Sequence, residues 1–471
     1  MSRMLALFVS SVLLSVGDAK QSLIDSIESR RAHYAEIAEQ IWRQPELGYL
    51  EEHSSALLAT ELEKQGFEVR RAVAGIPTAF TASYGSGKPV IAVLGEFDAL
   101  PGMSQAAAPE QKVVTAGAPG HACGHNLFGT GSMAAAIAVK EWMTSTKHAG
   151  TVRFYGTPAE EGGGGKLYML RAGLFADVDV ALAWHPADRN DLSEARSLAA
   201  IGADFRFHGV AAHASIAPDK GRSALDGVES MDFMINMMRE HIPSAARIHY
   251  VITSGGKAPN IVPEFASSSY IVRHPDLEVL DALWQRVLGA ANGAASGTGT
   301  TMDYEVISFY YPILGNSALT ELQRKNFERV GGVKYTKDEQ AFAESLAKTL
   351  PSGGLAIGSQ ESIAAPDPMS ALGSTDVGDV SWNVPTGHMD IATWVPGTPP
   401  HTWQAVAAAG SSIGEKGMIV AAKTLALTAF DLLDDPAKVA AARAEFDKRV
   451  GSRAYTWRLG DRKPPLDYRR N

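Results

Sequence analysis

The chain has 471 residues, of which 45% are hydrophobic and 20% are charged, a composition typical of a soluble globular protein with two or three domains. Its formal net charge is -9 at pH 7, and it has no run of lysine and arginine, which argues against nucleic acid as a partner. Cys123 is the single cysteine, so the chain has no intrachain disulfide.

The first residues have the layout of a secretory signal peptide. Arg3 precedes an apolar run from Met4 to Val16, and the small residues that follow suit cleavage after Ala19. This run is shorter than the about 20 residues that a membrane-spanning helix needs, and later apolar runs are shorter still. We therefore expect residues 1–19 to be a signal peptide, no stable membrane span, and a periplasmic or secreted protein; without export it would be cytoplasmic.

Beyond this leader, apolar periodicity predicts helices over Ser22–Trp42 and Glu51–Gln65. Three strands are then expected over Phe67–Val73, Thr78–Tyr84 and Val90–Leu94. The last strand is continuously apolar, as in a strand buried on both faces, and Glu96 and Asp98 follow its carboxyl end. Ligands bind at this edge of open α/β sheets, although either carboxylate alone is as readily explained as a turn former.

Cys123 lies in the motif His121-Ala122-Cys123-Gly124-His125-Asn126. A thiolate and imidazoles suit zinc or a similar transition ion, whereas a buried inert thiol is the competing explanation. A helix is predicted over Asn126–Met143, so this motif lies at a helix N-terminus, where the helix dipole favours the thiolate.

Two later strand ends carry further polar side chains. The strand Thr151–Tyr155 leads to the adjacent carboxylates Glu160 and Glu161, which four glycines follow. Neighbouring side chains diverge, so one carboxylate can bind a metal while the other faces a reacting water, and glycine allows close approach of the backbone. The strand Val178–Ala183 leads to His185 in the same way.

Residues 197–312 have a different character and predict an inserted α+β domain whose sheet is covered by two helices. The expected strands are Ala200–His208, Ile248–Thr253, Phe265–Arg273 and Met302–Tyr310, and the expected helices are Ala224–His241 and Leu277–Asn292. His213, Asn260 and Arg273 lie at its turns and strand ends, and each alone is more often structural. The flanking residues 20–196 and 313–471 are then the two parts of one α/β domain.

The second part begins with predicted helices over Ser317–Val330 and Lys337–Leu350 and ends with an apolar helix over Gly417–Leu433. Between them lie loops punctuated by glycine and proline and rich in Asp, His and Trp, over residues 373–382, 387–390 and 396–403. Such loops belong to functional sites more often than to cores.

These motifs occur in a characteristic order: Gly-Glu-Phe-Asp-Ala-Leu-Pro, His-Ala-Cys-Gly-His-Asn, Pro-Ala-Glu-Glu-Gly, Trp-His-Pro, Ala-Ala-His-Ala and Pro-Gly-Thr-Pro-Pro-His-Thr-Trp. Together they resemble the aminoacylase/carboxypeptidase family of dinuclear metallopeptidases, in its amidohydrolase branch of hippurate and indoleacetyl-amino-acid hydrolases. The resemblance covers the chain after the leader. It implies a zinc-peptidase-like α/β catalytic domain with a central mixed sheet and an inserted lid and dimerisation domain.

The resemblance also implies roles for particular residues. Two divalent metal ions, Mn²⁺ or Zn²⁺, would be bound by Cys123, His125, Glu161, His185 and His401. Glu160 would be the general base, and His213 would reach the active site of a neighbouring subunit, while Asn260 and Arg273 would hold the substrate carboxylate. Relatives have Ala-Asp-x-Asp where this chain has Glu96 and Asp98, which leaves open which of the two orients a metal ligand.

The expected reaction is hydrolysis of an N-acyl or N-aroyl amino acid by a metal-activated water, with Glu160 as the base. Three alternatives stay open: a metallo-dipeptidase or carboxypeptidase of the same family, a thiol hydrolase and a non-catalytic accessory subunit. The thiol hydrolase is less favoured, since Cys123 and His125 are two residues apart and do not readily meet as nucleophile and base. The expected partners are a small acyl-amino acid and either a second copy or a related subunit.

Overall fold

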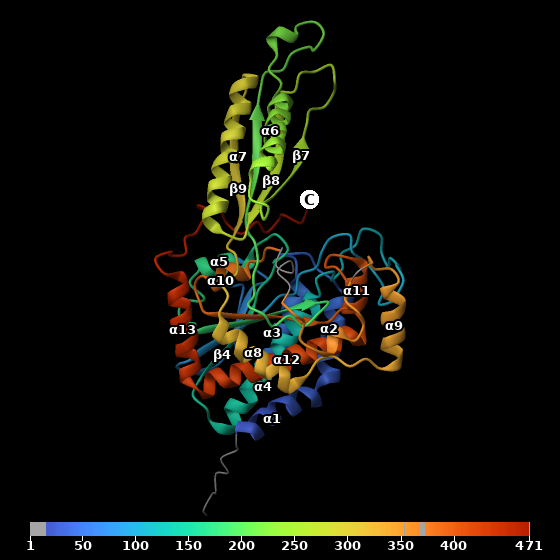
Figure 1. The fold of residues 1–471 in the computed structure, drawn as a ribbon, viewed down its shortest axis with the longest axis vertical. Helices are drawn as coiled ribbons and strands as arrows, with labels where there is room; N and C mark the ends of the chain where they lie inside the picture. The colour runs from blue at the N-terminus through green and yellow to red at the C-terminus, as the bar shows by residue number, and fades with distance from the viewer. Residues whose placement is uncertain (1–15, 353, 367–372, 471) are drawn as a thin grey trace, which may run out of the picture.

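The structure, a computed structural model, describes residues 16–352, 354–366 and 373–470. Figure 1 shows a broad α/β body and a narrow extension of strands and helices that stands on it, which we call the lid. The first 15 residues of the predicted leader lie outside the described part, so the signal peptide and export stay predictions. Among the described residues, no helix has the length and apolar character needed to cross a membrane.

The body is built on a six-stranded mixed sheet with the strand order β1-β2-β4-β3-β5-β10. The strands are β1 (Glu68–Arg71), β2 (Phe80–Ser86), β3 (Val90–Gly95), β4 (Gly150–Gly156), β5 (Val180–Ala187) and β10 (Thr386–Ala392). The last four named are parallel to one another, whereas β1 and β2 pair antiparallel. The carboxyl ends of four strands therefore meet at one edge of the sheet.

Helices cover this sheet, and the longest two, α4 and α12, pack against each other and against its central strands. The helices of the body are α1 (Val16–Ser29), α2 (Arg31–Arg43), α3 (Glu52–Lys64), α4 (His125–Thr146), α5 (Gly165–Arg171), α8 (Ser317–Val330), α9 (Lys337–Ala347), α10 (Val377–Ser381), α11 (Trp403–Ala409), α12 (Ser412–Asp434) and α13 (Pro436–Val450). The first half of α4 is buried on every side, which identifies it as a core helix.

Three expectations for the body were wrong. Residues 377–381, expected within a loop, form the short helix α10. The single helix expected over Ser22–Trp42 is two helices that break at Arg30, where the side chains of Ser26 and Arg30 both bond to Glu141 of α4. Tertiary contacts thus override a continuous helical pattern. Residues 387–390, expected as a loop, belong to strand β10, which pairs with β5 from Thr386 onward.

The lid is a four-stranded antiparallel sheet with the order β7-β8-β6-β9, covered by two helices as predicted. Its elements are β6 (Ala199–His208), α6 (Ala224–Met238), β7 (Arg247–Ser254), β8 (Phe265–His274), α7 (Leu277–Thr298) and β9 (Thr301–Tyr310). Aromatic and aliphatic side chains between sheet and helices form a core separate from that of the body. The predicted α/β fold with an inserted α+β domain is therefore confirmed.

Candidate active site

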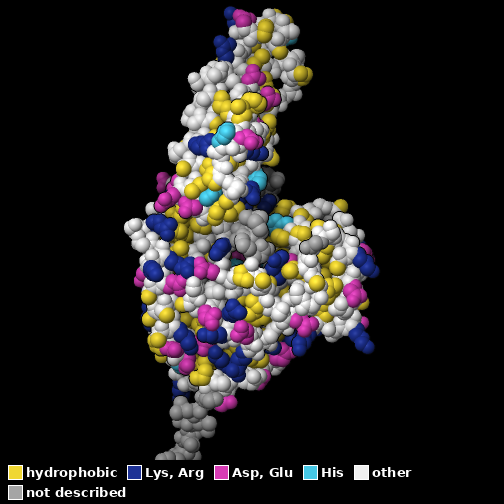
Figure 2. Space-filling model, in the orientation of Figure 1, with side chains coloured by type: hydrophobic (Ala, Val, Ile, Leu, Met, Phe, Trp, Pro, Cys, Tyr) yellow, Lys and Arg dark blue, Asp and Glu magenta, His cyan; other side chains and the backbone are white. Residues whose placement is uncertain are grey.

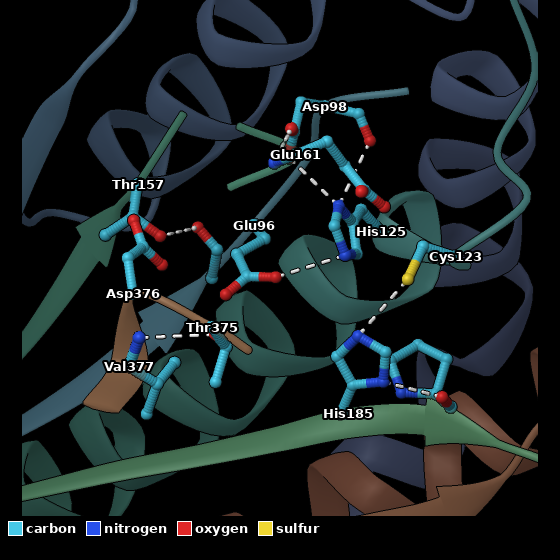
Figure 3. Close-up of polar contacts among 12 residues, drawn as sticks. Glu96, Asp98, Cys123, His125, Thr157, Glu161, His185, Thr375, Asp376 and Val377 are labelled. Atoms are coloured by element: carbon cyan, nitrogen blue, oxygen red, sulfur yellow. Dashed lines mark hydrogen bonds and ion pairs between the residues drawn. The ribbon is translucent and has the colours of Figure 1, made fainter. Parts of the chain in front are cut away.

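Polar side chains from four segments meet at the carboxyl edge of the sheet, as the sequence predicted. Glu96 and Asp98 follow β3, Cys123 and His125 lie at the start of α4, Glu160 and Glu161 follow β4, and His185 lies near the end of β5. Figure 3 shows Glu96, Asp98, Glu161 and His185 gathered around His125 at the start of α4. The edge that binds ligands in open α/β sheets thus gathers acids and imidazoles from distant parts of the chain.

Cys123, His125 and His185 form the first cluster. The Cys123 Sγ and His185 Nε2 atoms are 3.4 Å apart, and one ligand atom from each of the three residues lies within 4.8 Å of the others. Gly124 between them has φ +73°, and a Cβ there would lie 2.7 Å from the Pro186 side chain. Glycine is therefore required for the turn that directs the thiol and the imidazole to the same point.

Cys123 also belongs to a second cluster, with Glu161 and His401. The His401 Nε2 and Glu161 Oε1 atoms are 3.2 Å apart, and the backbone N–H of His401 donates to the carbonyl of Ala122 at 3.0 Å. His401 has φ +58°, a left-handed conformation that costs a non-glycine residue energy and is often retained at functional sites. The structure thus brings together all five predicted ligands; their binding of metal stays a prediction.

Asp98 and Glu96 contact opposite nitrogens of His125. The Asp98 Oδ1 atom is 2.9 Å from His125 Nδ1, and Asp98 Oδ2 accepts the backbone N–H of Glu161 at 2.9 Å. Asp98 is therefore the residue that orients His125, as carboxylates do behind metal-binding histidines. Glu96 Oε2 lies 3.1 Å from His125 Nε2, and the two residues form a third cluster with Glu160.

The site carries more negative charge than the described side chains compensate. Burial, reinforced by the charge of Glu161, raises the pKa of the Cys123 thiol well above its usual value. Burial also raises the pKa of Glu160, and the charges of Glu96 and Glu161 raise it further. A bound cation would offset this cost and allow the thiolate to form.

Poorly paired polar atoms lead to the same conclusion. Among the described residues, His125 Nε2, Glu96 Oε2 and Glu161 Oε1 are buried and have a polar neighbour at 3.1 to 3.2 Å, but none of the three makes a hydrogen bond of good geometry. Buried polar atoms are normally hydrogen-bonded, so three such atoms in one place indicate a missing ligand. Burial also lowers the pKa of His185 to about 3, and the ring is then in the neutral form that binds metals. The donor set fits divalent transition ions.

A buried lysine beneath the site escaped the sequence analysis. The Lys166 Nζ atom lies 2.6 Å from both Glu96 Oε1 and Asp376 Oδ1, and Lys166 is fully buried. Its helix, α5, begins at Gly165, where a Cβ would collide with the carbonyl of Pro158. In the sequence, this role is indicated by the position of a charged residue between the glycine run and the apolar residues 167–169. Lys166 fixes the orientation of Glu96 and offsets part of its charge.

A cavity of about 900 Å³ opens beside these clusters, between the body and the lid. Cys123, Glu160 and His185 line it from the body, and Arg273 and Tyr310 line it from the lid. Arg273 is half-buried: its Nη1 donates to Ser374 Oγ at 3.3 Å, and its Nε has no hydrogen-bond partner among the described residues. A guanidinium group in the cavity wall suits a substrate carboxylate, the role predicted for Arg273.

The structure does not bring His213 and Asn260 to the cavity of their own chain. Ala200, at the start of β6, lines the cavity. His213 and Asn260 follow the other ends of lid strands, and a strand as long as β6 separates its two ends by about 30 Å. There they lie together: the backbone N–H of Ala214 donates to the Asn260 carbonyl at 3.0 Å. Their predicted roles therefore require a second chain.

A buried anionic set of thiol, imidazole and carboxylate groups, placed at the carboxyl edge of an α/β sheet beside a cavity, defines a metal-dependent amidohydrolase. Residues 92–416 match Peptidase family M20/M25/M40 over more than half of the chain. The chain belongs to this family, which confirms the resemblance that its motifs indicated.

Individual relatives agree with this assignment. The chain is 42% identical to one of the subunits of the p-aminobenzoyl-glutamate hydrolase of Escherichia coli (strain K12), over 92% of this chain and 95% of the relative. It is 29% identical to the Xaa-Arg dipeptidase of Mus musculus, over 91% of this chain and 92% of the relative. A dinuclear metal binding peptidase from the M20 family of Bacillus subtilis shares the fold, with a TM-score of 0.60 and 18% identity over 86% of this chain and 99% of that one.

Proposed function

We propose that this protein hydrolyses the amide bond of N-acyl or N-aroyl amino acids, with p-aminobenzoyl-glutamate-like substrates favoured. The observation that carries the proposal is the convergence of Cys123, His125, Glu161, His185 and His401 around one point, with Glu160 beside them. The substrate class is supported by the 42% identity to one component of a p-aminobenzoyl-glutamate hydrolase, against 29% to a dipeptidase. A metallo-dipeptidase is therefore the less favoured alternative.

Two clusters that share Cys123 suit two divalent ions, either Mn²⁺ or Zn²⁺. Cys123, His125 and His185 would hold one ion, and Cys123, Glu161 and His401 would hold the other. The ions would supply Lewis acidity and lower the pKa of water from about 16 toward about 7.

The remaining steps belong to the side chains of this protein. Arg273 binds the substrate carboxylate from the lid side of the cavity and places the amide over the site. The Glu160 carboxylate takes a proton from the attacking water and then donates it to the nitrogen of the leaving amino acid. His213, supplied by a second chain, donates a hydrogen bond to the developing oxyanion, a contribution of roughly 3 to 4 kcal/mol.

An assay of the purified single chain tests this proposal. Metal-free protein is expected to be inactive on p-aminobenzoyl-glutamate and other N-acyl amino acids, and added Mn²⁺ or Zn²⁺ is expected to restore hydrolysis. Because buried Cys123 would be a metal ligand, thiol alkylation of the metal-loaded enzyme should leave the rate unchanged, whereas a chelator should abolish it. Bound metal without hydrolysis of any such substrate would favour the accessory-subunit alternative.

The exposed side of the lid supports assembly with another chain. Strand β7 is an edge of the lid sheet, and apolar side chains are exposed along it and on the neighbouring helix α6, with Phe233, Met237 and Val251 between 59% and 66% exposed. Figure 2 shows hydrophobic side chains gathered on the visible face of the lid. We propose that this edge pairs with a second copy to form a homodimer. A related subunit is the alternative partner, because the Escherichia coli relative is itself named as one component of a larger enzyme.

Complementation between inactive variants tests the role of His213. The backbone N–H groups of Ser215 and Ile216 point to His213 Nδ1, which leaves Nε2 as the protonated nitrogen of the neutral ring. We expect His213→Ala and Glu160→Gln each to abolish activity alone. Co-expression of the two variants in equal amounts should restore about a quarter of the wild-type activity, because half of the symmetric dimers then contain one complete site. Absence of recovery in purified mixed dimers would show that His213 does not act across subunits.

A further inference from the structure

The residues that follow α13 run along the junction between body and lid. This segment, residues 452–470, which we call the strap, is the dark red trace that crosses the base of the lid in Figure 1. Leu459 of the strap is buried in the core of the lid, whereas Leu466 and Tyr468 pack against the core of the body. The strap is therefore anchored by apolar contacts on both sides of the junction.

Polar contacts reinforce both anchors. Toward the lid, Arg458 pairs with Asp281 of α7 at 3.0 Å, and Arg462 pairs with Glu305 of β9. Toward the body, Arg171 of α5 donates to the carbonyl of Arg462 at 2.8 Å. Exposed ion pairs contribute little one by one, but together with the buried leucine they fix the course of the strap.

The far end of the strap reaches the loop that carries the two candidate catalytic carboxylates. The Tyr468 hydroxyl donates to the backbone carbonyl of Glu161 at 3.1 Å, and Arg469 Nη2 donates to the same oxygen at 2.8 Å. The Tyr468 ring also packs edge-on against Tyr49, whose hydroxyl donates to the carbonyl of Gly163 at 2.7 Å. Side chains from elsewhere in the chain thus hold two carbonyls of the loop, those of Glu161 and Gly163.

The hydrogen bonds within the loop do not involve the carbonyl of Glu161, because the N–H groups of Gly163 and Gly164 donate to the carbonyl of Ala159. Glu161 is followed by four glycines, and glycine has the widest conformational freedom of any residue. The N–H of Glu161 donates to Asp98, which also orients His125, and the carbonyl of Glu161 accepts only from Tyr468 and Arg469 among the contacts of the described residues. Both backbone polar groups of Glu161 are therefore fixed, one by Asp98 and one by the strap.

We infer that Tyr468 and Arg469 are positioning residues that hold Glu161 in its metal-binding orientation, and that the strap delivers them by bridging the lid and the body. They act through the backbone of Glu161 and do not touch the reacting atoms. The inference rests on the proposed role of Glu161 as a metal ligand. Outer partners of this kind typically change metal affinity or activity by about 10- to 100-fold when they are removed.

The test compares metal affinity in the full-length, metal-free protein, titrated with Mn²⁺ or Zn²⁺ by calorimetry. Arg469→Gln and the double variant Tyr468→Phe/Arg469→Gln are expected to bind metal about 10-fold more weakly than wild type. Arg470→Gln is the matched control: Arg470 is the exposed neighbour of Arg469, and it should bind metal as wild type does. Arg469→Lys keeps a donor and should recover part of the affinity.

Thermal unfolding of the same metal-free samples separates positioning from general destabilisation. The positioning role predicts weaker metal binding with a melting temperature close to that of Arg470→Gln. A double variant that binds metal as tightly as the control would overturn the inference, and so would a loss that Arg469→Lys does not relieve. If wild-type protein binds neither metal, the proposed function fails instead, so the two failures are distinguishable.

Discussion

Glu160→Gln is expected to lower kcat about 10³-fold while the protein keeps its bound metal. Glutamine has nearly the same shape as glutamate but cannot accept a proton from water. The five predicted ligands, which include Cys123 and Glu161, are unchanged in this variant. Steady-state kinetics together with metal analysis of the same sample measure both quantities. A metal-loaded variant with a rate near that of wild type would remove Glu160 from the mechanism.

The neighbouring substitution Glu161→Gln is the matched control. Glu161 Oε1 is buried, makes no hydrogen bond of good geometry among the described residues and lies 3.2 Å from His401 Nε2, so this variant should lose metal as well as activity. If Glu160→Gln keeps its metal and Glu161→Gln loses it, Glu160 acts as a base and Glu161 as a metal ligand. If both variants lost metal equally, Glu160 would be a ligand in the cluster that it forms with Glu96 and His125.

The sequence predicted the location of the site because the chemistry lies at strand ends. Continuous apolar runs mark β3 and β5 as buried strands, and parallel buried strands present their carboxyl ends at one edge. Residues just beyond those ends, such as Asp98 and His185, must then approach one another. The spacing within each motif could not decide between Glu96 and Asp98, since that choice depends on which nitrogen of His125 each carboxylate contacts.

What the sequence could not provide depends on contacts between distant segments. Strand β10 is short, contains glycine and follows a proline, so its pattern resembles a loop until it pairs with β5. The strap has no periodic pattern, and its function becomes visible only where Tyr468 and Arg469 meet the carbonyl of Glu161. Lys166 is a single charge in an apolar run, and its partners lie 70 and 210 residues away in the sequence.

Lys166→Met is expected to lower the free energy of unfolding of the metal-free protein by about 3 to 5 kcal/mol. Methionine preserves much of the side-chain volume, but it leaves the carboxylates of Glu96 and Asp376 buried without their shared cation. The control is Lys325→Met, which removes an exposed pair with Glu321 and should change the free energy of unfolding by about 1 kcal/mol or less. Urea denaturation of both variants measures the difference.

The free energy of unfolding that Lys166→Met loses relative to wild type, its stability deficit, should also depend on pH. Burial raises the pKa of Asp376 from 3.8 to about 6, even though Lys166 opposes this shift. Removing the ammonium group raises that pKa further, so in the variant the folded state favours the protonated acid more strongly. A carboxyl whose pKa is higher in the folded state contributes stability that is lost as pH rises through its folded pKa. The deficit should therefore be smallest near pH 4 and grow as the pH rises past about 6. A deficit that stays constant over this range would mean that Lys166 stabilises the protein by packing and not by its charge.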